Sequence, residues 1–236
     1  MVLAKSEHKT CNEMEELEQL LSLDGKKILE LGCGKAEITR FIATNGYGRE
    51  ITATEVDEVQ HTNNMLIEDL PNVTFLMAGA EKIPLDDGIF DIVFMFKSLH
   101  HVPGDLMGSA LSEITRVLKP GGIAYISEPV FKGDFNEVLR IFHDEEEVRE
   151  MAYGAINNSI SSQEFLSVKE LFFNVPMYFE NFEVFEDKII NVTHSNHELS
   201  AELIQRVKEQ FLLNMKDDGA NFLMPIRVNL LRKSDS

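Results

Sequence analysis

The sequence predicts an α/β protein with a doubly wound, mostly parallel sheet of seven strands and an inserted helical cap. Apolar runs alternate with helical stretches from Lys26 to about Pro129, which is typical of strand–helix–strand units with parallel strands. The apolar run at 27–31 also breaks into a glycine turn and then a helix, as in sheets that bind ligands at the carboxyl ends of their strands. With 236 residues, the chain is long enough for one large domain with an embedded cap.

An amphipathic helix is predicted over residues 10–23, where leucine and methionine recur at helical spacing. The strands predicted next are 27–31, 50–54, 73–77, 89–96 and 122–128, and the helices between them are 36–44, 57–69 and 104–118. These strands are rich in apolar residues, so we expect both of their faces to be buried. The segment Lys119-Pro120-Gly121-Gly122 predicts the end of a helix and a turn before the fifth strand.

The alternation changes after Pro129. A helical block with an acidic centre is predicted over 134–173, followed by a strand at 182–192, a helix at 197–215 and a last strand at 221–232. We therefore divide the chain into an N-terminal helix (1–25), a ligand-binding α/β core (26–130), a helical cap (131–175) and a C-terminal part that completes the sheet (176–236).

The composition restricts the partners of the chain. There are 22 basic and 40 acidic side chains, a formal net charge of −18, which disfavours binding to the phosphates of nucleic acids. Cys11 and Cys33 form neither a disulfide framework nor a metal-binding spacing, so we expect no metal. The first residues lack an apolar signal core, and no apolar run approaches membrane-spanning length. We therefore expect a cytoplasmic protein with a small-molecule partner and leave its oligomeric state open.

The glycine turn predicts the kind of ligand. A dinucleotide-binding turn has a third glycine where this chain has Glu37, because the pyrophosphate lies against that helix N-terminus. Here Glu30 ends the strand before the turn, and Glu55 ends the next strand. Two acids near the turn suit a ligand with an ammonium group, a sulfonium group and a ribose, which describes S-adenosylmethionine. Cys33 is interpreted as a small residue that fills the turn.

Several segments in order resemble class I S-adenosylmethionine-dependent methyltransferases, particularly the small-molecule branch that includes ubiquinone- and menaquinone-biosynthesis enzymes. The segments are 30–34 with Glu55, 79–85 followed by 90–94, 98–102, and 113–122. The resemblance covers about 26–130 and implies the strand order 3-2-1-4-5-7-6. It also implies S-adenosylmethionine as the cofactor.

The resemblance implies a set of cofactor-binding residues around the turn. They are Glu30, Gly32, Cys33, Gly34, Glu55, Val56, Gln60, Gly79, Ala80, Glu81, Lys97 and Ser98. Glu55 is expected to hold the ribose hydroxyls. Relatives often have Asp at the position of Gly79, where its carboxylate accepts from the adenine amino group. Here the Ala80 backbone or the Glu81 side chain has to replace it, or the adenine is held by stacking alone.

Two adjacent histidines follow the fourth predicted strand, at the expected crevice. One of them is expected to be structural and bonded to the backbone, and His101 is the candidate catalytic residue, either as a general base or as a group that positions the acceptor. The aromatic residues between 165 and 185 are interpreted mainly as core, with some of them as possible lining of an apolar acceptor pocket.

The predicted function is transfer of a methyl group from S-adenosylmethionine to a small or medium-sized, partly apolar acceptor by in-line displacement. One alternative is a non-catalytic S-adenosylmethionine-binding sensor or partner subunit, which the missing acid at Gly79 leaves open. The other is an NAD-dependent oxidoreductase, against which Glu37 and the segment 119–122 argue.

Overall fold

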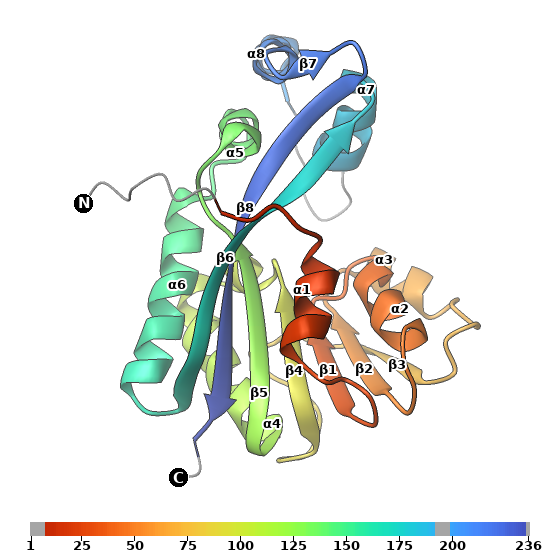
Figure 1. Ribbon diagram of the computed structural model, residues 1–236, viewed down its shortest axis with the longest axis vertical. Helices are drawn as coiled ribbons and strands as arrows, with labels where there is room; N and C mark the ends of the chain where they lie inside the picture. The colour runs from red at the N-terminus through yellow and green to blue at the C-terminus, as the bar shows by residue number, and fades with distance from the viewer. Residues whose placement is uncertain (1–7, 192–198, 235–236) are drawn as a thin grey trace. The chain divides into compact units, whose positions relative to one another are not determined.

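The computed structural model of the chain describes residues 8–191 and 199–234 (Figure 1). The chain divides into two compact units. The first unit comprises Met1–Leu20, Pro129–Glu146 and Phe172–Arg227, and the second comprises Leu21–Glu128, Glu147–Leu171 and Val228–Ser236. Two long strands, β6 and β8, pass from one unit into the other along the chain.

The sheet has eight strands, and the predicted fold class is confirmed. The strands are β1 (Lys27–Leu31), β2 (Glu50–Glu55), β3 (Val73–Met77), β4 (Phe90–Phe96), β5 (Leu118–Pro129), β6 (Phe165–Phe179), β7 (Met215–Lys216) and β8 (Gly219–Lys233). Their order is β3-β2-β1-β4-β5-β8-β6, with β7 paired to β8 off this path. The seven longer strands thus have the predicted order, and the two-residue β7 is the one that the sequence analysis did not anticipate.

Strands β1 to β5 pair in parallel, whereas Figure 1 shows β8 running opposite to β5 and β6. The parallel pairing brings the carboxyl ends of β1, β2, β3 and β4 to one edge of the sheet. The glycine turn after β1 and the acid at the end of β2 both lie at this edge. The fold therefore places the predicted ligand-binding residues on one edge within the second unit.

The second unit contains the three helices predicted between its strands, although the one predicted at 57–69 ends at Asn64. Its helices are α2 (Glu37–Thr44), α3 (Glu58–Asn64), α4 (Met107–Val117) and α6 (Glu146–Ser161), together with the short 3-10 turns η1 (Leu99–His101) and η2 (Gly104–Leu106). Asp57 caps α3 by accepting from the N–H groups of Val59 and Gln60. Helix α4 buries residues at spacings of three and four, so one face of it packs on the core.

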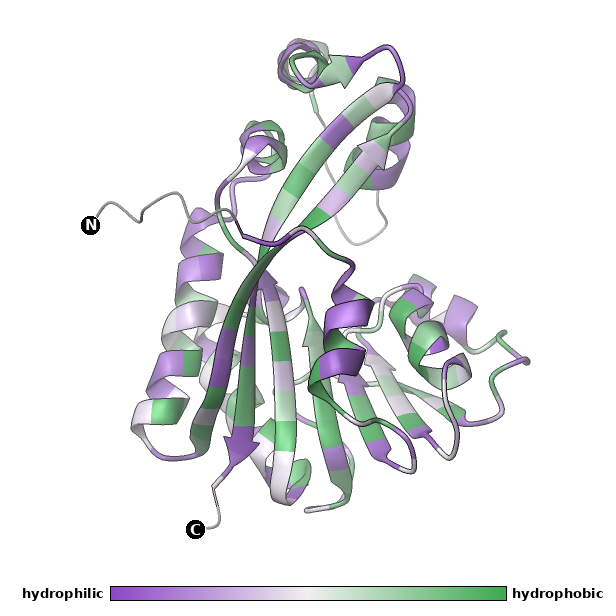
Figure 2. Ribbon diagram, in the orientation of Figure 1, coloured by the Kyte–Doolittle hydropathy of each residue, from purple (hydrophilic) through white to green (hydrophobic). Residues whose placement is uncertain are grey.

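The core of the second unit consists of aliphatic and aromatic side chains from the central strands and α4. Figure 2 shows the apolar character of β4, of which six of seven residues are buried. The turn at 119–122 is part of β5 in the structure, but the pairing of β5 with β4 shifts register there. Gly121 has a φ of 70°, a conformation that favours glycine, so the turn predicted before the fifth strand is found as an irregularity within β5.

The first unit has an aromatic core of its own. Its helices are α1 (Glu13–Leu20), α5 (Asp134–Leu139), α7 (Phe182–Phe185), the π-helical turn η3 (Glu186–Ile190) and α8 (Ala201–Leu212). Six phenylalanines pack with ring centroids 5.1 to 6.4 Å apart. They are Phe135, Phe179, Phe182, Phe185, Phe211 and Phe222, and each is buried. Edge-to-face arrangements of this kind are favourable for aromatic rings.

Two predicted elements of the second half are wrong. The last part of the predicted helical block 134–173 is instead strand β6, which begins at Phe165, and five consecutive residues of that strand, 166–170, are exposed. A regular period-two pattern does not extend through this strand, because Lys169 and Glu170 are adjacent and three apolar residues, 171–173, follow them. The strand predicted at 182–192 is helical from Phe182 to Ile190, because Phe182 and Phe185 face the same core at a spacing of three and Asn181 caps the turn. Residue 192 lies outside the described residues.

The predicted aromatic lining of an acceptor pocket is not supported by the positions of these rings. Phe179, Phe182 and Phe185 belong to the closed core of the first unit, and Phe165 belongs to the core of the second. Phe172 and Tyr178 are exposed. The phenylalanines therefore stabilise the two cores through burial of apolar surface.

Candidate functional site

The turn after β1 places bare backbone against the end of β4. Gly32 has a φ of 76°, and a Cβ there would lie 2.8 Å from the Cβ of Ser98, so no other residue fits. The Ser98 hydroxyl donates to the carbonyl of Leu31 at 2.9 Å. Gly34 and Ala36 also have positive φ values, 53° and 58°. This strained turn leads into α2 and leaves Gly32 exposed at the carboxyl edge of the sheet.

The Glu55 carboxylate links the turn to the end of β2. One oxygen accepts from the N–H of Gly34 at 2.6 Å, and the other accepts from Val56 at 2.8 Å and Asp57 at 2.9 Å. The side chain is 7% exposed. A carboxylate offers about four acceptor positions, so three backbone bonds leave one for a ligand hydroxyl. A second hydroxyl would have to take the place of the Gly34 N–H.

Asn64 of α3 holds the other side of the turn. Its amide donates to the carbonyl of Gly34 at 2.8 Å and contacts the sulfur of Cys33 at 3.5 Å. Cys33 is buried, and burial together with the nearby acids raises the pKa of its thiol far above the usual range. A thiol held neutral is a poor nucleophile and a poor metal ligand. The interpretation of Cys33 as a turn-filling residue agrees with this environment.

Glu30 is an acid inside the core, 2% exposed, at the fourth position of β1. Burial raises the pKa of its carboxyl group to about 7, while the hydroxyl of Thr39, which donates at 2.7 Å, lowers it and the negative charge of Glu55 raises it. The group therefore exchanges its proton near neutral pH. A cationic ligand group nearby would favour its ionised form.

Glu81 covers the backbone of Gly79. A Cβ at position 79 would lie 2.3 to 2.6 Å from the carboxylate atoms of Glu81, a flexible side-chain end. The acid of residue 81 therefore occupies the space that an aspartate at 79 would enter. Of the two replacements predicted for the missing acid, this geometry favours the Glu81 side chain over the Ala80 backbone.

The remaining predicted cofactor residues differ in exposure. Val56, directly after β2, is 62% exposed, whereas Gln60 is buried in the first turn of α3 and Ala80 is part of the core. Lys97 has a φ of 54°, and its N–H donates to the carbonyl of Ser127 at 2.7 Å. The structure therefore joins the turn to Glu55 and Ser98 by direct contacts, while Val56 offers an exposed apolar surface at the same edge.

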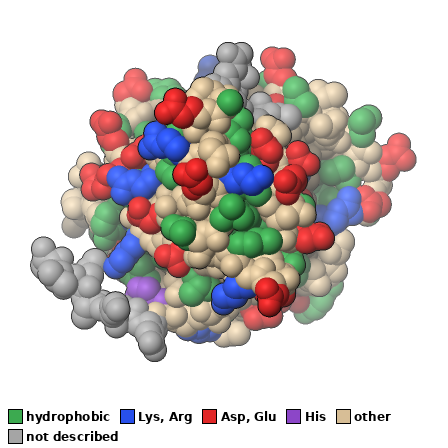
Figure 3. Space-filling model, turned by 90° about the horizontal axis from the view of Figure 1, so that it is seen from above, with side chains coloured by type: hydrophobic (Ala, Val, Ile, Leu, Met, Phe, Trp, Pro, Cys, Tyr) green, Lys and Arg blue, Asp and Glu red, His purple; other side chains and the backbone are tan. Residues whose placement is uncertain are grey.

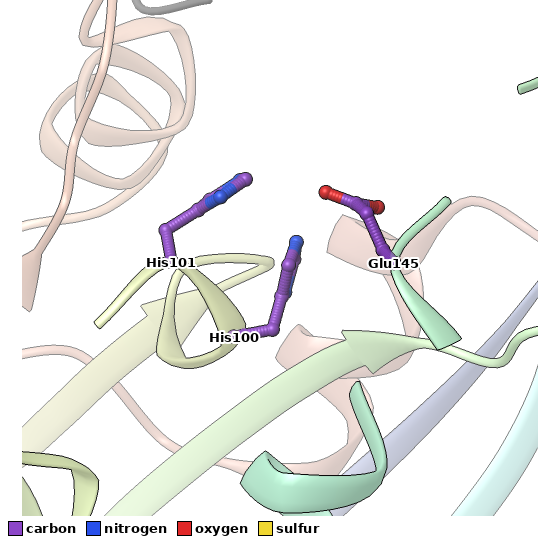
Figure 4. A group of neighbouring side chains, drawn as sticks. All are labelled: His100, His101 and Glu145. Carbon is purple, nitrogen blue, oxygen red and sulfur yellow. The ribbon is translucent and has the colours of Figure 1, made fainter. Parts of the chain in front are cut away.

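The two histidines have different environments. His100 is buried, and its Nδ1 pairs with a carboxylate oxygen of Glu128, which is 1% exposed at the end of β5. His101 is exposed, with its ring centroid 4.0 Å from that of His100. Figure 4 shows the two rings side by side on the turn η1; Glu145, also drawn there, belongs to the first unit. The structural histidine is thus held by a carboxylate, where a backbone partner was expected.

Three residues at this edge were missed in the sequence analysis. Glu128 is an acid at the end of the apolar run 122–128. Its position could have drawn attention to it, because an acid in a buried strand needs a partner. Thr39 and Asn64 lie on helices and bond to Glu30 and Gly34. Nothing in a single sequence pairs Thr39 with the strand acid nine positions before it, or Asn64 with a loop carbonyl thirty positions before it, so neither residue carried a usable signal.

The donor set fits S-adenosylmethionine. The turn exposes the backbone of Gly32, and the acids Glu30 and Glu55 lie at the ends of the neighbouring strands. These groups would bind the ammonium group and the ribose. The closest carboxylates would repel a pyrophosphate, so the turn fits a dinucleotide less well.

The outer surface gives further information on partners. On the face shown in Figure 3, basic side chains are interspersed among acidic ones. Among the residues that the structure describes, no helix is both long enough and apolar enough to cross a bilayer.

The central segment of the chain is similar to known methyltransferases. Residues 29–126 match the family model described as "Methyltransferase domain". An uncharacterized methyltransferase of Synechocystis sp. is 33% identical over 107 residues, which cover 45% of this chain and 49% of that protein. A ubiquinone/menaquinone biosynthesis C-methyltransferase of Psychromonas ingrahamii is 30% identical over 125 residues, 51% of this chain and 48% of that protein. The chain thus spans about half the length of the curated relatives it matches.

A solved structure extends the likeness of the fold beyond this segment. The YcgJ protein of Bacillus subtilis superposes with a TM-score of 0.66 at 15% identity, covering 94% of this chain and 98% of that one. The resemblance to class I S-adenosylmethionine-dependent methyltransferases is therefore confirmed over the central segment, and with it the cofactor class.

Replacing Glu30 by Gln should stabilise the protein above neutral pH. Below about pH 4.5 the wild-type carboxyl group is protonated in both the folded and unfolded states, so it makes no pH-dependent difference. Between about 4.5 and 7 only the unfolded state ionises, so wild-type stability falls as the pH rises. The difference between 4.5 and about 7 corresponds to roughly 3 kcal/mol as an upper bound.

Urea unfolding of Glu30→Gln and wild type from pH 5 to pH 8 measures this effect. The variant should gain on the order of 1–3 kcal/mol relative to wild type across that range. Glu37→Gln, an exposed acid on the same turn, is the control and should show no such trend. A stability difference that does not change with pH would contradict the argument.

Proposed function

Because residues 29–126 belong to the methyltransferase-domain family, we propose that this chain transfers the methyl group of S-adenosylmethionine to a small or medium-sized, partly apolar acceptor. The observation that carries the proposal is the turn after β1, where Gly32 and Gly34 meet Ser98 and Glu55 in direct contact. This arrangement gives a ligand exposed backbone on one side and a carboxylate on the other. The family match supports the same assignment independently.

The cofactor residues have separate roles in this proposal. Glu55 accepts a hydrogen bond from a ribose hydroxyl, and the negative charge of Glu30 attracts the ammonium group. Val56 packs its exposed apolar side chain against the adenine. Glu81 accepts from the adenine amino group in place of the acid that Gly79 cannot supply. The other proposed contacts are with Gly32, Cys33, Gly34, Gln60, Ala80, Lys97 and Ser98.

Bound S-adenosylmethionine supplies a methyl group already activated by the sulfonium. The protein then mainly has to hold the acceptor atom about 3 Å from the methyl carbon and in line with the bond that breaks. His101, exposed on η1 after β4, is proposed to touch the acceptor. A net charge of −18 favours neutral or cationic acceptors over anionic ones. The quinone-biosynthesis relative supports an apolar ring on the acceptor.

The alternatives predict different binding. A non-catalytic protein would bind S-adenosylmethionine and S-adenosylhomocysteine without turning over any acceptor. An oxidoreductase would bind NAD, which the acids of the turn disfavour. Thermal shifts with these three ligands separate the oxidoreductase from the other two candidates. Incubation with methyl-labelled S-adenosylmethionine and a panel of phenols, hydroquinones and small amines separates the remaining two, because only the enzyme gives a labelled product.

Glu55→Gln should weaken binding of S-adenosylmethionine. The amide loses the charge-assisted bonds to the ribose and cannot accept from Gly34 through its nitrogen, so we expect a loss of roughly 1.5–3 kcal/mol, about ten- to a hundredfold in Kd. Isothermal titration calorimetry measures it. Glu58→Gln, which changes an exposed acid at the first position of α3, is the control. Wild-type affinity in a folded Glu55→Gln variant would remove the ribose assignment.

The pair Gly79 and Glu81 provides an exchange test for the adenine contact. Glu81→Ala should weaken S-adenosylmethionine by about 1 kcal/mol, the usual size of one hydrogen bond. Adding Gly79→Asp to that variant should restore the affinity, because the Glu81 atoms nearest to a Cβ at residue 79 are then gone and Gly79 has no positive φ. If the double variant binds no better than Glu81→Ala, neither carboxylate contacts the adenine.

His101→Gln tests contact with the acceptor. A residue that only positions the acceptor affects mainly KM, so we expect KM to rise by about tenfold and the pH profile to stay unchanged. The measurement uses the best acceptor from the panel and, in parallel, the Kd of S-adenosylmethionine, which should not change. A large fall in kcat together with a changed pH profile would instead assign the proton transfer to His101. Unchanged kinetics would place His101 outside the site.

A further inference from the structure

We propose that Arg116 and Glu113 of α4 are positioning residues for the adenine, because they hold the loop that places the Glu81 carboxylate beside Gly79. The inference rests on the proposed binding of S-adenosylmethionine and adds two residues to it. Both belong to the segment 113–122, which carries part of the family resemblance and has no other role in the proposed function. We expect neither side chain to touch the cofactor.

The loop between β3 and β4, residues 78–89, has no helix or strand of its own. Within it, the N–H of Lys82 donates to the carbonyl of Gly79 at 3.3 Å and closes a turn that contains Glu81. A loop of this kind is held in one form by its contacts with the surrounding elements. The position of the Glu81 carboxylate therefore depends on the residues that bind the loop from outside.

The guanidinium of Arg116 binds the loop at three points. It donates to the carbonyls of Ile83 and Leu85, each at 2.8 Å, and to the carboxylate of Asp87 at 2.6 Å. A planar guanidinium presents its donors in a fixed arrangement, which the ammonium group of a lysine does not reproduce. Arg116 thus fixes the path of the loop backbone shortly after the turn that contains Glu81.

Glu113, on the preceding turn of α4, binds the same part of the loop. One of its carboxylate oxygens accepts from the N–H of Ile83 at 2.8 Å and from Arg116 at 2.8 Å, and the other accepts from Arg116 at 2.7 Å. The guanidinium holds the pKa of this carboxyl group below its usual range, so the group is ionised at neutral pH. Both backbone groups of Ile83, two residues after Glu81, are therefore bound by α4 side chains.

The two ends of the loop are bound through main-chain groups alone. The N–H of Ala78 donates to the carbonyl of Glu55 at 3.2 Å, and the N–H of Gly88 donates to the carbonyl of Arg116 at 2.9 Å. These bonds do not depend on the side chain of Arg116. Loss of the guanidinium should therefore release the middle of the loop, with Glu81, while the ends stay in place.

Amide hydrogen exchange followed by NMR tests this effect without any ligand. Arg116→Lys keeps the charge but loses the fixed set of hydrogen bonds, so the N–H of Ile83 should exchange at least about tenfold faster than in the wild type. The N–H of Gly88 is the internal control and should exchange at an unchanged rate, because its acceptor is the main chain. Equal rates at Ile83 in the two proteins would overturn the inference.

The preference for adenine tests the consequence for binding. S-inosylhomocysteine has a carbonyl oxygen where S-adenosylhomocysteine has the amino group, so a carboxylate that accepts from the amino group disfavours it. By calorimetry, the wild type should bind S-adenosylhomocysteine about tenfold more tightly, and Arg116→Lys should prefer it by no more than about threefold. A merely structural role would change both Kd values together and leave their ratio unchanged.

Arg40→Lys is the matched control for the preference. Arg40 also binds a carboxylate, that of Asp69, through two nitrogens, and both side chains are exposed. The pair lies outside the loop between β3 and β4, so Arg40→Lys should keep the wild-type ratio of the two Kd values. The same fall in both arginine variants would overturn the inference, because the effect would then not depend on the loop.

The outcomes distinguish this inference from the proposed function. If the wild type binds neither S-adenosylmethionine nor S-adenosylhomocysteine, the proposed function is overturned and the inference with it. If it binds S-inosylhomocysteine equally well, the adenine contact of Glu81 and the inference fail, but cofactor binding stands. If Arg116→Lys alone keeps the preference, only the inference is overturned. If Arg116→Lys does not fold, Glu113→Ala replaces it, and a wild-type preference in that variant would overturn the inference.

Discussion

The close approach of the Gly32 backbone to Ser98 is the constraint on which the candidate site depends. Parallel pairing of β1 with β4 brings their carboxyl ends together, but only a residue without a Cβ allows this contact. The contact fixes the start of the segment that continues through η1 to both histidines. A single backbone position thus relates the proposed cofactor turn to the segment that carries both histidines.

The second constraint is the burial of three acids at the same edge of the sheet. Glu30, Glu55 and Glu128 are 2%, 7% and 1% exposed. Each is compensated differently: Glu30 by a hydroxyl and a raised pKa, Glu55 by backbone N–H groups, and Glu128 by an imidazole. Such an edge attracts a cationic ligand and repels phosphates. The charge of the whole chain acts in the same direction, so local and overall electrostatics agree on the class of ligand.

The central strands could be predicted well from the sequence because the apolar runs that mark them are local patterns. β1 and β3 have the predicted bounds. β1 is buried on both faces and is therefore an apolar run between turn residues. β3 lies at the edge of the sheet and has no buried residue, so the expected burial of both its faces is wrong, although its apolar run still marked the strand. β6 was missed because an edge strand with five exposed residues in succession has no such signal. In the site, the glycine turn and Glu55 could be predicted, because they follow the first two predicted strands directly along the chain. The pairing of Glu128 with His100 could not, because it depends on the register of β4 and β5 across 28 positions.

The aromatic core of the first unit is separate from the residues proposed to contact the acceptor. Its phenylalanines pack against one another with ring centroids 5.1 to 6.4 Å apart, within the range of stable ring pairs, and each is buried in that core. The groups proposed to contact the acceptor lie instead at the carboxyl edge of the second unit, above all His101 and the backbone around Lys97 and Ser98. Lys97 has a left-handed backbone, a conformation that costs energy in a residue with a side chain. Strain of this kind persists where the surrounding structure enforces it, and here it directs the chain from β4 into the turn that carries the histidine pair.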